Sequence, residues 1–537
     1  MSQLGALIGS SLLISQSDLP AFSPKNIVDL GTVMAVGTTA ATPYDCANIA
    51  TEKERMHFDT FEIHKTRSPI LVIVYRMKAI LRLLALLLVA SLQADNARPP
   101  VVSLPVVSVV EGSKPVRQAQ DRPNIVLIMA DDLGFETMGS YGGTSYNTPN
   151  LDRLAANGAR FEHCYAQPIC TPSRVQIMTG QYNVRNYKKF GLLPRSEITF
   201  AHKLKEQGYA TCIAGKWQLG TQKDAPQHFG FDEALLWQHT GSGRKHIDGK
   251  RIDKRYENPI LEKNGATFEY HNGEFAPDLM VDFIVDFIER KKDQSFLVYY
   301  PMILTHCPFM PTPHSEDWNP NSIGSPTYKG DKRYFKDMVE YVDHLVGKIE
   351  AELDRQGLLE NTYLIFTADN GTDRPVVSML NGQPFPGRKG SLTDGGTHVP
   401  LIASRPGKIP ANVHKDLIDF SDFLPTFCEI AGASTEPLTL DGRSFLPQLH
   451  GETGKPRDFV YCWYNRDMQP GTTQASARNQ RYKLYASGAF YDVMNDLQET
   501  QPLADADLSP EQRVIKAALQ AVIEHYDQFD RVVAPAQ

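Results

Sequence analysis

The stretch NIVLIM at residues 124–129 is a short continuous run of apolar side chains, and it indicates the class of the fold. Such a run predicts a strand that is buried on both faces of a parallel sheet. Similar runs recur as YATCIA at residues 209–214, FLVYY at 296–300 and YLIFT at 363–367, with segments of helical periodicity between them. The sequence therefore predicts an α/β fold in which a large, mostly parallel sheet is sandwiched by helices.

Each of these predicted strands ends in polar side chains of a catalytic type. In open α/β sheets, ligands bind outside the carboxyl ends of the strands, so side chains far apart in the sequence meet at one edge. We expect the functional site at this edge. The side chains that follow the four strands in turn are Asp131 and Asp132, Lys216 and Gln218, Thr305 and His306, and Asp369 and Asn370.

The stretch CTPSRVQIMTG at residues 170–180 predicts a helix that begins at Cys170. Pro172 falls in the first turn, where no backbone N–H is needed, and Gly180 is suited to end the helix. An anion bound beside Cys170 is stabilised by free N–H groups and by the positive end of the helix dipole. Because Arg174 adds a fixed positive charge, the segment favours a bound tetrahedral oxyanion.

Asp131, Asp132, Asp369 and Asn370 together offer a cluster of hard oxygen ligands. Ca²⁺ prefers several such oxygens, whereas zinc favours histidine or cysteine. Taken singly, an Asp-Asp pair after a strand is also typical of a turn or a helix cap, and Asp-Asn-Gly of a simple turn. Because all four residues fall at strand ends, we expect a metal site there, with calcium as the ion.

The chain has 537 residues, of which 42% are hydrophobic and 22% charged, and its formal net charge is −7. This composition is ordinary for a soluble globular protein and argues against a dedicated nucleic-acid binder, which is usually basic. The seven cysteines are scattered without CxxC or zinc-type spacing, so no metal-thiolate cluster is expected. With Cys46 outside the mature chain and Cys170 reserved for chemistry, five remain, and at least one thiol stays free.

Residues 77–94, MKAILRLLALLLVASLQA, have the anatomy of a secretory signal peptide, with Lys78 and Arg82 ahead of an apolar run. The run is too short to span a bilayer, so we expect a cleaved signal and no stable membrane span. The protein is then secreted or periplasmic. Residues 1–76 precede this internal start and are interpreted as a non-native or unstructured extension from a start-site error, with an unusual targeting extension as the alternative.

Three further segments complete the predicted domain organisation. Residues 95–120, rich in Pro, Val and Ser, are expected to form a linker. A catalytic α/β domain follows at residues 121–430, and its irregular stretch at 224–275 is interpreted as an insertion loop over the site. Beyond residue 430 the alternation stops, and residues 431–537 predict a smaller α+β subdomain with an antiparallel sheet and a helix from Pro510.

Seven motifs give the chain a resemblance to a known family. CTPSRVQIMTG resembles the signature of the type I sulfatases, arylsulfatase-like members of the alkaline phosphatase superfamily, and six further motifs extend the match from about residue 123 to the C-terminus. They are ADDLG at 130–134, TPNLDRLAANG at 148–158, GKWQLG at 215–220, THCP at 305–308, TADNG at 367–371 and GRKGSLTDGG at 387–396. The resemblance implies an alkaline phosphatase-like fold and a hydrolase that acts on sulfate esters of carbohydrates or aryl alcohols.

The resemblance also implies the roles of individual residues. In this family the cysteine of the signature is converted to formylglycine before secretion, which requires a formylglycine-generating or equivalent maturation enzyme as a partner. Arg174 and Lys216 are then expected to contact the sulfate or the nucleophile, while His306 and Lys389 bind sulfate and assist the leaving alcohol. The implied calcium ligands are Asp131, Asp132, Asp369, Asn370 and the modified Cys170, and the implied catalytic residues are Cys170, Arg174, Lys216, His306 and Lys389.

The implied reaction has two steps. One hydroxyl of the hydrated formyl group, a gem-diol, attacks sulfur while His306 or Lys389 protonates the leaving alcohol and the nearby cations stabilise the developing charge. The second hydroxyl then loses its proton, and sulfate is expelled from the enzyme-bound ester. This second step requires a base.

Gln218 departs from the family pattern at the position where that base is expected. The family usually has His in GKWHLG, whereas a neutral amide cannot accept a proton at ordinary pH. Another base substitutes, the enzyme is slower, or the chain belongs to a subgroup with an altered site; we favour a substitute base, with His306 or His239 as candidates. Asp394 and His398 stand where the family has Glu and Arg, and both changes are interpreted as local packing.

Two alternative functions stay open at this point. A phosphodiesterase or phosphonate hydrolase of the same superfamily acts on an anion of similar shape, and a sulfated-glycan-binding protein without turnover is suggested by Gln218. The expected partner of a sulfatase is a sulfated carbohydrate or aryl sulfate substrate, and no nucleic acid.

Overall fold

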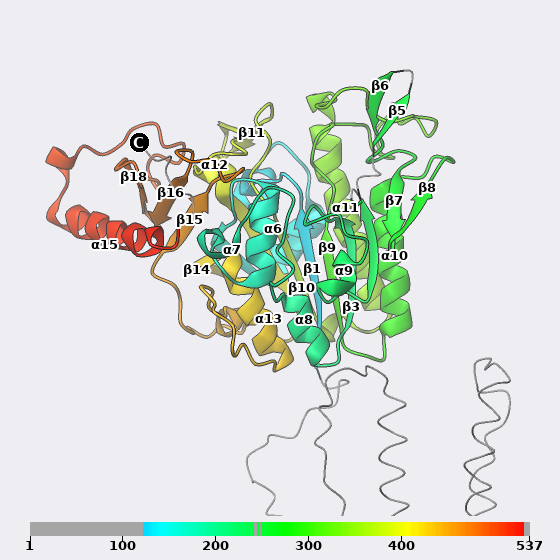
Figure 1. The fold of residues 1–537 in the computed structure, drawn as a ribbon, viewed down its shortest axis with the longest axis horizontal. Helices are drawn as coiled ribbons and strands as arrows, with labels where there is room; N and C mark the ends of the chain where they lie inside the picture. The colour runs from blue at the N-terminus through cyan, green and yellow to red at the C-terminus, as the bar shows by residue number, and fades with distance from the viewer. Residues whose placement is uncertain (1–121, 238, 241–243, 248, 531–537) are drawn as a thin grey trace, which may run out of the picture. The chain divides into compact units, whose positions relative to one another are not determined.

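The computed structural model describes residues 122–530 apart from residues 238, 241–243 and 248 (Figure 1). The expected extension at 1–76, signal peptide at 77–94 and linker at 95–120 therefore lie outside the described residues. Within the described ranges, none of the helices has the length and apolar surface that a bilayer-spanning segment requires.

A ten-stranded sheet forms the centre of the fold, in the strand order β14-β2-β13-β10-β1-β9-β3-β4-β7-β8. β1 (Asn124–Ala130) lies parallel to both β9 (Phe296–Pro301) and β10 (Thr362–Ala368), and β3 (Ala210–Lys216) lies parallel to β9 on its other side. All residues of these four strands are buried, which confirms the strands expected from the apolar runs. The other strands of the sheet are β2 (Ala159–Tyr165), β4 (Glu233–Trp237), β7 (Ile260–Lys263), β8 (Ala266–Glu269), β13 (His398–Ser404) and β14 (Asn412–Asp419).

Helices pack with this sheet in two groups. α10 (Ala276–Lys291) contacts β3, β9 and α11 (Phe335–Arg355), which in turn contacts α5 (Pro149–Asn157). α6 (Cys170–Thr179), α8 (Phe200–Glu206) and α13 (Phe423–Ala431) contact one another as the second group. The predicted α/β fold, with a large and mostly parallel sheet between helices, is confirmed. Short elements lie in the connections: α7 (Asn183–Asn186), α9 (Ala225–His228), α12 (Asp394–Thr397), α14 (Leu446–Leu449), and the 3₁₀ turns η3 (Phe135–Thr137), η4 (Gly139–Tyr141), η5 (Lys332–Tyr334), η6 (Leu359–Asn361), η7 (Phe420–Asp422) and η8 (Asp505–Asp507).

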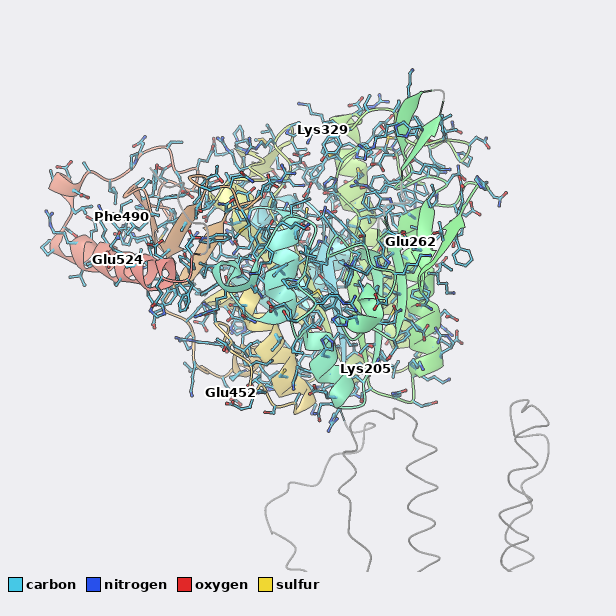
Figure 2. The ribbon with its side chains drawn as sticks, viewed as in Figure 1. Lys205, Glu262, Lys329, Glu452, Phe490 and Glu524 are labelled. Atoms are coloured by element: carbon cyan, nitrogen blue, oxygen red, sulfur yellow. The ribbon has the colours of Figure 1, made fainter. Side chains whose placement is uncertain are left out.

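The C-terminal part forms a second, four-stranded antiparallel sheet. Its strands β15 (Val460–Tyr464), β16 (Gln474–Arg478), β17 (Tyr482–Tyr485) and β18 (Phe490–Asp492) pair in sequence order, and α15 (Pro510–Asp527) packs on β16 and β17. Figure 2 shows Phe490 of β18 and Glu524 of α15 on the same side of the described residues, at the left of the view. The predicted smaller antiparallel sheet with a C-terminal helix is therefore confirmed.

The stretch at residues 224–275 differs from the irregular loop that we expected. It holds α9, β4 and two hairpins, β5 (Arg244–Ile247) with β6 (Lys250–Asp253) and β7 with β8, and both β4 and β7 extend the large sheet. The β7–β8 hairpin turns at Asn264 and Gly265, whose φ values are 49° and 82°. Asn-Gly is a strong hairpin signal, but strands of four or five residues are too short to display an alternating pattern. The prediction of a stretch without regular elements was therefore wrong.

A further hairpin, β11 (Val377–Leu380) with β12 (Gln383–Pro386), follows β10.

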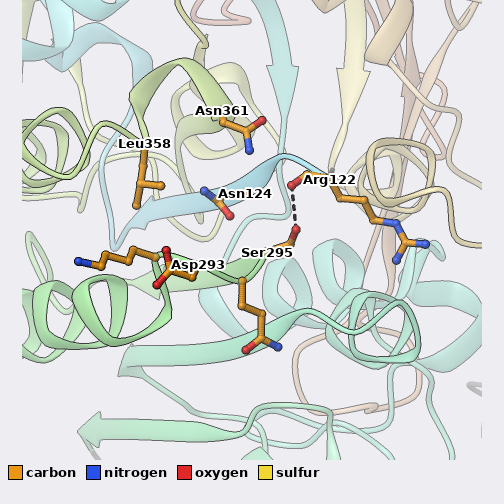
Figure 3. A pocket seen from close by; sticks show the side chains of 8 residues that line it. Arg122, Asn124, Asp293, Ser295, Leu358 and Asn361 are labelled. Carbon is orange, nitrogen blue, oxygen red and sulfur yellow. Dashed lines mark hydrogen bonds between the residues drawn. The ribbon is translucent and has the colours of Figure 1, made fainter. Parts of the chain in front are cut away.

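A hollow of about 230 Å³ lies at the amino ends of the central strands (Figure 3). Asn124 at the start of β1, Ser295 before β9 and Asn361 before β10 line it, and the Ser295 hydroxyl donates a 2.8 Å hydrogen bond to the carbonyl of Arg122. Because ligands of open α/β sheets bind at the opposite, carboxyl edge, this hollow is not where we expect the chemistry.

Candidate active site

The polar residues that follow the central strands do converge at the carboxyl edge of the sheet. The loop after β1 is joined to the loops after β9 and β10 by backbone hydrogen bonds, from Asp131 N to the Leu304 carbonyl (2.7 Å) and from Asp369 N to the Ala130 carbonyl (2.9 Å). Asp131, Asp132, Asp369 and Lys216 are all buried with at most 1% of their surface exposed. Charged groups that are buried in this way require partners that balance their charge. These residues are partners for one another.

Cys170 occupies the first position of α6, as the sequence predicts. Ile169 before it is extended, and Gly180 ends the helix in the left-handed conformation (φ 70°). The Cys170 Sγ atom lies 3.1 Å from Lys216 Nζ and 3.4 Å from Asp131 Oδ1. Burial and the nearby charge of Asp369 raise the pKa of the Cys170 thiol well above its usual range, against the effect of Lys216. As a thiol, this side chain is therefore protonated at physiological pH and poorly suited to attack.

Two buried ion pairs surround the start of α6. Lys216 Nζ lies 2.8 Å from Asp131 Oδ2, and Arg174 Nη2 lies 2.9 Å from Asp369 Oδ2. Burial alone raises the pKa of Asp131, but the charges of Lys216, Arg174 and Lys389 outweigh it and lower that pKa to about 2. Burial followed by repulsion from Asp131 raises the pKa of Asp369 to about 6, against the attraction of Arg174. The four groups form one coupled charge network beneath Cys170.

The oxygen atoms of the predicted metal site face one another. The Asp132 backbone, in a left-handed conformation (φ 64°), donates from its N–H to Asp369 Oδ1 at 3.2 Å. Asn370 Nδ2 donates to Asp132 Oδ1 at 2.8 Å, whereas the buried Asn370 Oδ1 has no hydrogen-bond partner among the described residues. Ligand atoms of Asp131, Asp132, Cys170 and His306 lie within 4.8 Å of one another. Three carboxylates and an unpaired amide oxygen fit a hard divalent cation, and the free Asn370 oxygen is the atom that such an ion satisfies.

Lys389 and His306 also lie close to the carboxylate of Asp132. Lys389 Nζ lies 2.6 Å from a carboxylate oxygen of Asp132, and His306 Nε2 lies 3.8 Å from Asp132 Oδ2. His306 Nδ1 lies 2.5 Å from both Arg255 Nη1 and the Cys307 carbonyl oxygen. Burial, followed by the charges of Lys389, Arg255 and Lys216, lowers the pKa of His306 well below its usual range.

A cleft lies above Cys170. Of the two histidines suggested as substitutes for the missing family histidine, only one lines it. Gln218 itself adopts a positive φ (53°), and its Oε1 atom accepts a hydrogen bond from the Thr171 hydroxyl at 3.3 Å. Among the described residues, His306 and Gln218 line the cleft, whereas His239 does not. His239 is buried, its Nε2 atom lies 2.6 Å from the Gln222 carbonyl oxygen, and its ring packs near Trp217.

The cleft above Cys170 has a volume of about 440 Å³ and includes residues that the sequence did not predict. Arg255 is 1% exposed, and its guanidinium carbon lies 4.1 Å from the ring centre of Trp237, a cation–π contact. It comes from the stretch that was interpreted as a loop, so its position depends on strands that were not expected. Tyr328, Arg374, Tyr464 and Arg466 also belong to this group.

Asp394 and His398 contact neighbouring elements of the fold, in line with the interpretation of both changes as local packing. Asp394 forms a buried ion pair with Arg478 of β16 (2.5 Å) and lies 3.7 Å from Lys483 Nζ. His398 stacks on Phe135, and its Nε2 atom lies 2.8 Å from the Glu162 carbonyl oxygen. These contacts fix the stretch that carries Lys389 against the second sheet.

Two family models match this chain. Residues 123–433 match the model described as Sulfatase, and residues 389–528 match the one described as N-sulphoglucosamine sulphohydrolase, C-terminal. The second match covers the antiparallel sheet and α15, and it begins at Lys389, so the two models overlap at the active-site loop.

Individual proteins with sulfatase names are also similar to this chain in sequence. Human arylsulfatase A is 34% identical over 374 residues, which are 64% of this chain and 70% of that protein. The canine N-acetylgalactosamine-6-sulfatase is 31% identical over 392 residues, 66% of this chain and 71% of that one. Among solved structures, that of Ps i-CgsB superposes with a TM-score of 0.64 at 24% identity and covers 76% of this chain and 94% of its own.

Proposed function

The chain belongs to the sulfatase family and is a sulfuric ester hydrolase, and from this premise we propose that a formylglycine at position 170 and a bound calcium ion carry out its chemistry. The family lies in the alkaline phosphatase superfamily, in line with the large α/β sheet. The observation that carries the proposal is that Cys170 opens a helix 3.1 Å from Lys216, amid three buried carboxylates. We propose sulfate esters of carbohydrates or aryl alcohols as the substrates.

The environment of position 170 supports an oxygen nucleophile more than a sulfur one. Burial raises the pKa of the thiol, and the neighbouring carboxylates repel a thiolate. A hydrated formyl group at this position supplies an oxygen nucleophile with a second hydroxyl. The cation of Lys216, beside this position, favours the ionised form of whichever group stands there.

We propose that Asp131, Asp132, Asp369, Asn370 and residue 170 hold the calcium ion. The unpaired, buried Asn370 Oδ1 and the closeness of the ligand atoms of Asp131, Asp132 and Cys170 support this ligand set, because hard oxygen atoms suit Ca²⁺. A bound calcium ion supplies positive charge that lowers the cost of ionising an oxygen at position 170.

The remaining polar residues bind the sulfate and move a proton. Lys216, Lys389 and His306 are proposed to donate hydrogen bonds to the sulfate oxygens, since all three side chains line the cleft. Arg174 holds Lys216 in place through a 2.9 Å bond to its carbonyl and neutralises Asp369. Lys389 Nζ, whose ammonium form the Asp132 carboxylate stabilises, is proposed to deliver the proton to the leaving alcohol, whereas His306, left neutral by burial and the nearby cations, is able to accept one.

Replacing His306 with Gln is expected to slow sulfate release by about 10²–10³-fold, because this side chain lies in the cleft where Gln218 cannot accept a proton. The matched variant His239→Gln changes a buried histidine that lies outside the cleft lining, and we expect its turnover to stay close to that of the enzyme without substitutions. Steady-state kinetics with an aryl sulfate make the comparison. Equal turnover in the two variants contradicts a role for His306 as the substitute base.

Added Ca²⁺ is expected to raise the melting temperature of the protein, since an ion that binds only the folded state stabilises it by about 2.7 kcal/mol at a hundredfold excess over its Kd. Asn370→Ala removes the free amide oxygen and should reduce this shift, whereas Asn412→Ala, on an exposed residue at the start of β14, should leave it unchanged. Thermal denaturation with and without Ca²⁺ measures both. An identical shift in the two variants argues against Asn370 as a ligand.

Rates on matched ester substrates test the proposed reaction against its closest alternative. With position 170 modified, we expect hydrolysis of an aryl sulfate to exceed hydrolysis of the corresponding aryl phosphodiester. The reverse preference supports a phosphodiesterase or phosphonate hydrolase instead. Binding of a sulfated glycan without any release of sulfate from the modified protein contradicts the proposal.

We further propose that the protein reaches a secreted or periplasmic location through the signal at residues 77–94, with a formylglycine-generating or equivalent enzyme as its maturation partner. The catalytic domain is proposed to occupy residues 121–430 and the C-terminal subdomain residues 431–537. N-terminal sequencing of the native protein tests the proposal that translation starts at Met77. Any peptide from residues 1–76 contradicts that proposal.

A further inference from the structure

The cleft carries more positive charge than one sulfate ester requires. Among its described lining residues, five side chains are cationic and one, Asp373, is anionic. Asp373 is already paired, since Lys329 Nζ lies 2.5 Å from its carboxylate. Figure 2 shows Lys329 near the top of the described residues. Cationic side chains therefore outnumber anionic ones among the described residues that line the cleft.

The inner and outer cations of the cleft differ in their partners. Lys216 and Lys389, next to Cys170, each contact an aspartate of the metal cluster at 2.8 and 2.6 Å. Arg374, which is exposed, donates from Nε to the Lys389 carbonyl at 2.9 Å and forms no ion pair within the described part of the chain. The inner cations are thus balanced by protein, whereas this outer guanidinium is not.

Arg466 brings a second outer guanidinium to the cleft from the loop after β15. Its side chain is 58% exposed and lies over the ring of Phe190, with the guanidinium carbon 4.9 Å from the ring centre. Its ion contact among the described residues, at 3.8 Å to the equally exposed Asp467, is of the kind that contributes little. The ring beneath it limits the orientations of the guanidinium, which prepares it to receive an anion.

Tyr464 connects the two outer arginines. Burial raises the pKa of its hydroxyl, while the charges of both Arg466 and Arg374 lower it, so both guanidiniums lie within electrostatic reach of the same ring. Tyr464 and the 60% exposed Tyr328 also line the cleft and present aromatic surface there. Aromatic surface beside a few fixed polar groups is typical of a site for a ring-shaped ligand.

We propose that the substrate is a dianionic or polyanionic sulfated sugar, in which Arg374 and Arg466 bind a second anionic group while the scissile sulfate lies at position 170. This inference rests on the proposed sulfatase function and adds the substrate class. The planar guanidinium fork suits both a sulfate and a carboxylate, so the shared chemistry is a second oxyanion on the sugar. Arg374 and Arg466 then select among substrates without acting on the reacting atoms.

Three probes test the proposal with the full-length, modified enzyme: a hexosamine with one sulfate, the same sugar with two sulfates, and a monosulfated disaccharide that contains a uronic acid. We expect kcat/KM to be higher for the doubly anionic probes, and their advantage over the monosulfated sugar to fall about tenfold in the Arg374→Gln/Arg466→Gln double variant. The advantage should also shrink with added salt, because exposed charges are screened. Whichever doubly anionic probe gains more identifies the second group as sulfate or carboxylate.

Two control variants separate charge from structure. Arg374→Lys/Arg466→Lys keeps both charges and should restore most of the advantage, and Arg513→Gln, on an exposed arginine of α15, should leave it unchanged. An equal preference for all three probes in the enzyme without substitutions, or an advantage that survives in the double Gln variant, overturns the proposal.

Calorimetric binding of the same probes separates failure of this inference from failure of the proposed function. Tighter binding of the doubly anionic sugars, lost in the double Gln variant, supports the second anion site even if no sulfate is released. In that case the proposed function alone is contradicted. Equal binding of all probes contradicts the inference whatever the turnover.

Discussion

Replacing Lys216 with Met is expected to lower kcat/KM for an aryl sulfate by about 10²–10³-fold, the effect of removing one fixed donor from a site that stabilises negative charge. Lys216 Nζ lies 2.8 Å from Asp131 and 3.1 Å from the side chain at position 170. Without this cation, negative charge on the side chain at position 170 loses a positive charge that lies 3.1 Å away. The loss should appear mainly in kcat, since the charge develops in the transition state.

Lys205→Met is the matched control for this substitution. Lys205 is 46% exposed, pairs with Asp232 at the surface, and lies in Figure 2 at the lower edge of the described chain. We expect its kcat/KM to equal that of the enzyme without substitutions. If Lys216→Met retains full activity while it folds normally, Lys216 does not have the proposed role.

The second large effect is expected on stability. Arg478→Met should lower the free energy of unfolding by about 3 kcal/mol, because breaking a buried ion pair leaves an uncompensated charge. Arg478 and Asp394 are 2.5 Å apart and both nearly fully buried, and burial of Asp394 is tolerated because the charges of Arg478 and Lys483 lower its pKa to about 2. The nearby Lys483 remains in the variant, which sets the expected loss at the lower end of the range for buried pairs.

Arg481→Met provides the comparison for Arg478→Met. Arg481 lies three residues further on, is 50% exposed and pairs with Asp492 at 2.8 Å. A surface pair of this kind contributes about 0–1 kcal/mol. Denaturant unfolding of the two variants measures both values, and equal losses contradict the role assigned to the buried pair.

The central strands and their polar ends were predictable because they follow simple rules. A run such as NIVLIM has few alternatives to a buried strand, and the carboxyl ends of parallel strands necessarily meet, so Asp131, Lys216, His306 and Asp369 came together as expected. The helix at Cys170 was equally clear, since Pro172 and Gly180 mark its ends. These features depend on local sequence and on one general property of sheets.

The rest of the cleft was not predictable because it depends on long-range packing. Arg255 reaches His306 only because β4 and β7 extend the large sheet, and these short strands leave no clear periodicity in the sequence. Arg466 is more than 270 residues from Phe190, which also lines the cleft, and nothing in either local sequence indicates that they meet. Such contacts follow from how the second sheet packs, which local patterns do not encode.

The structure changes the meaning of the missing family histidine. Gln218 still lines the cleft and is held by Thr171, so the site keeps a polar group there but no base. His306 lies across the same cleft, whereas His239 is occupied with the Gln222 carbonyl. The substitute-base hypothesis is thereby reduced to one described histidine of the two.

Mass spectrometry of the peptide that contains residue 170, isolated from active native protein, tests the central claim most directly. Because Cys170 opens α6 beside Lys216 within the stretch that matches the Sulfatase model, we expect the peptide to have the mass of formylglycine and sulfate release to scale with the modified fraction. An unmodified cysteine in fully active enzyme would contradict the account.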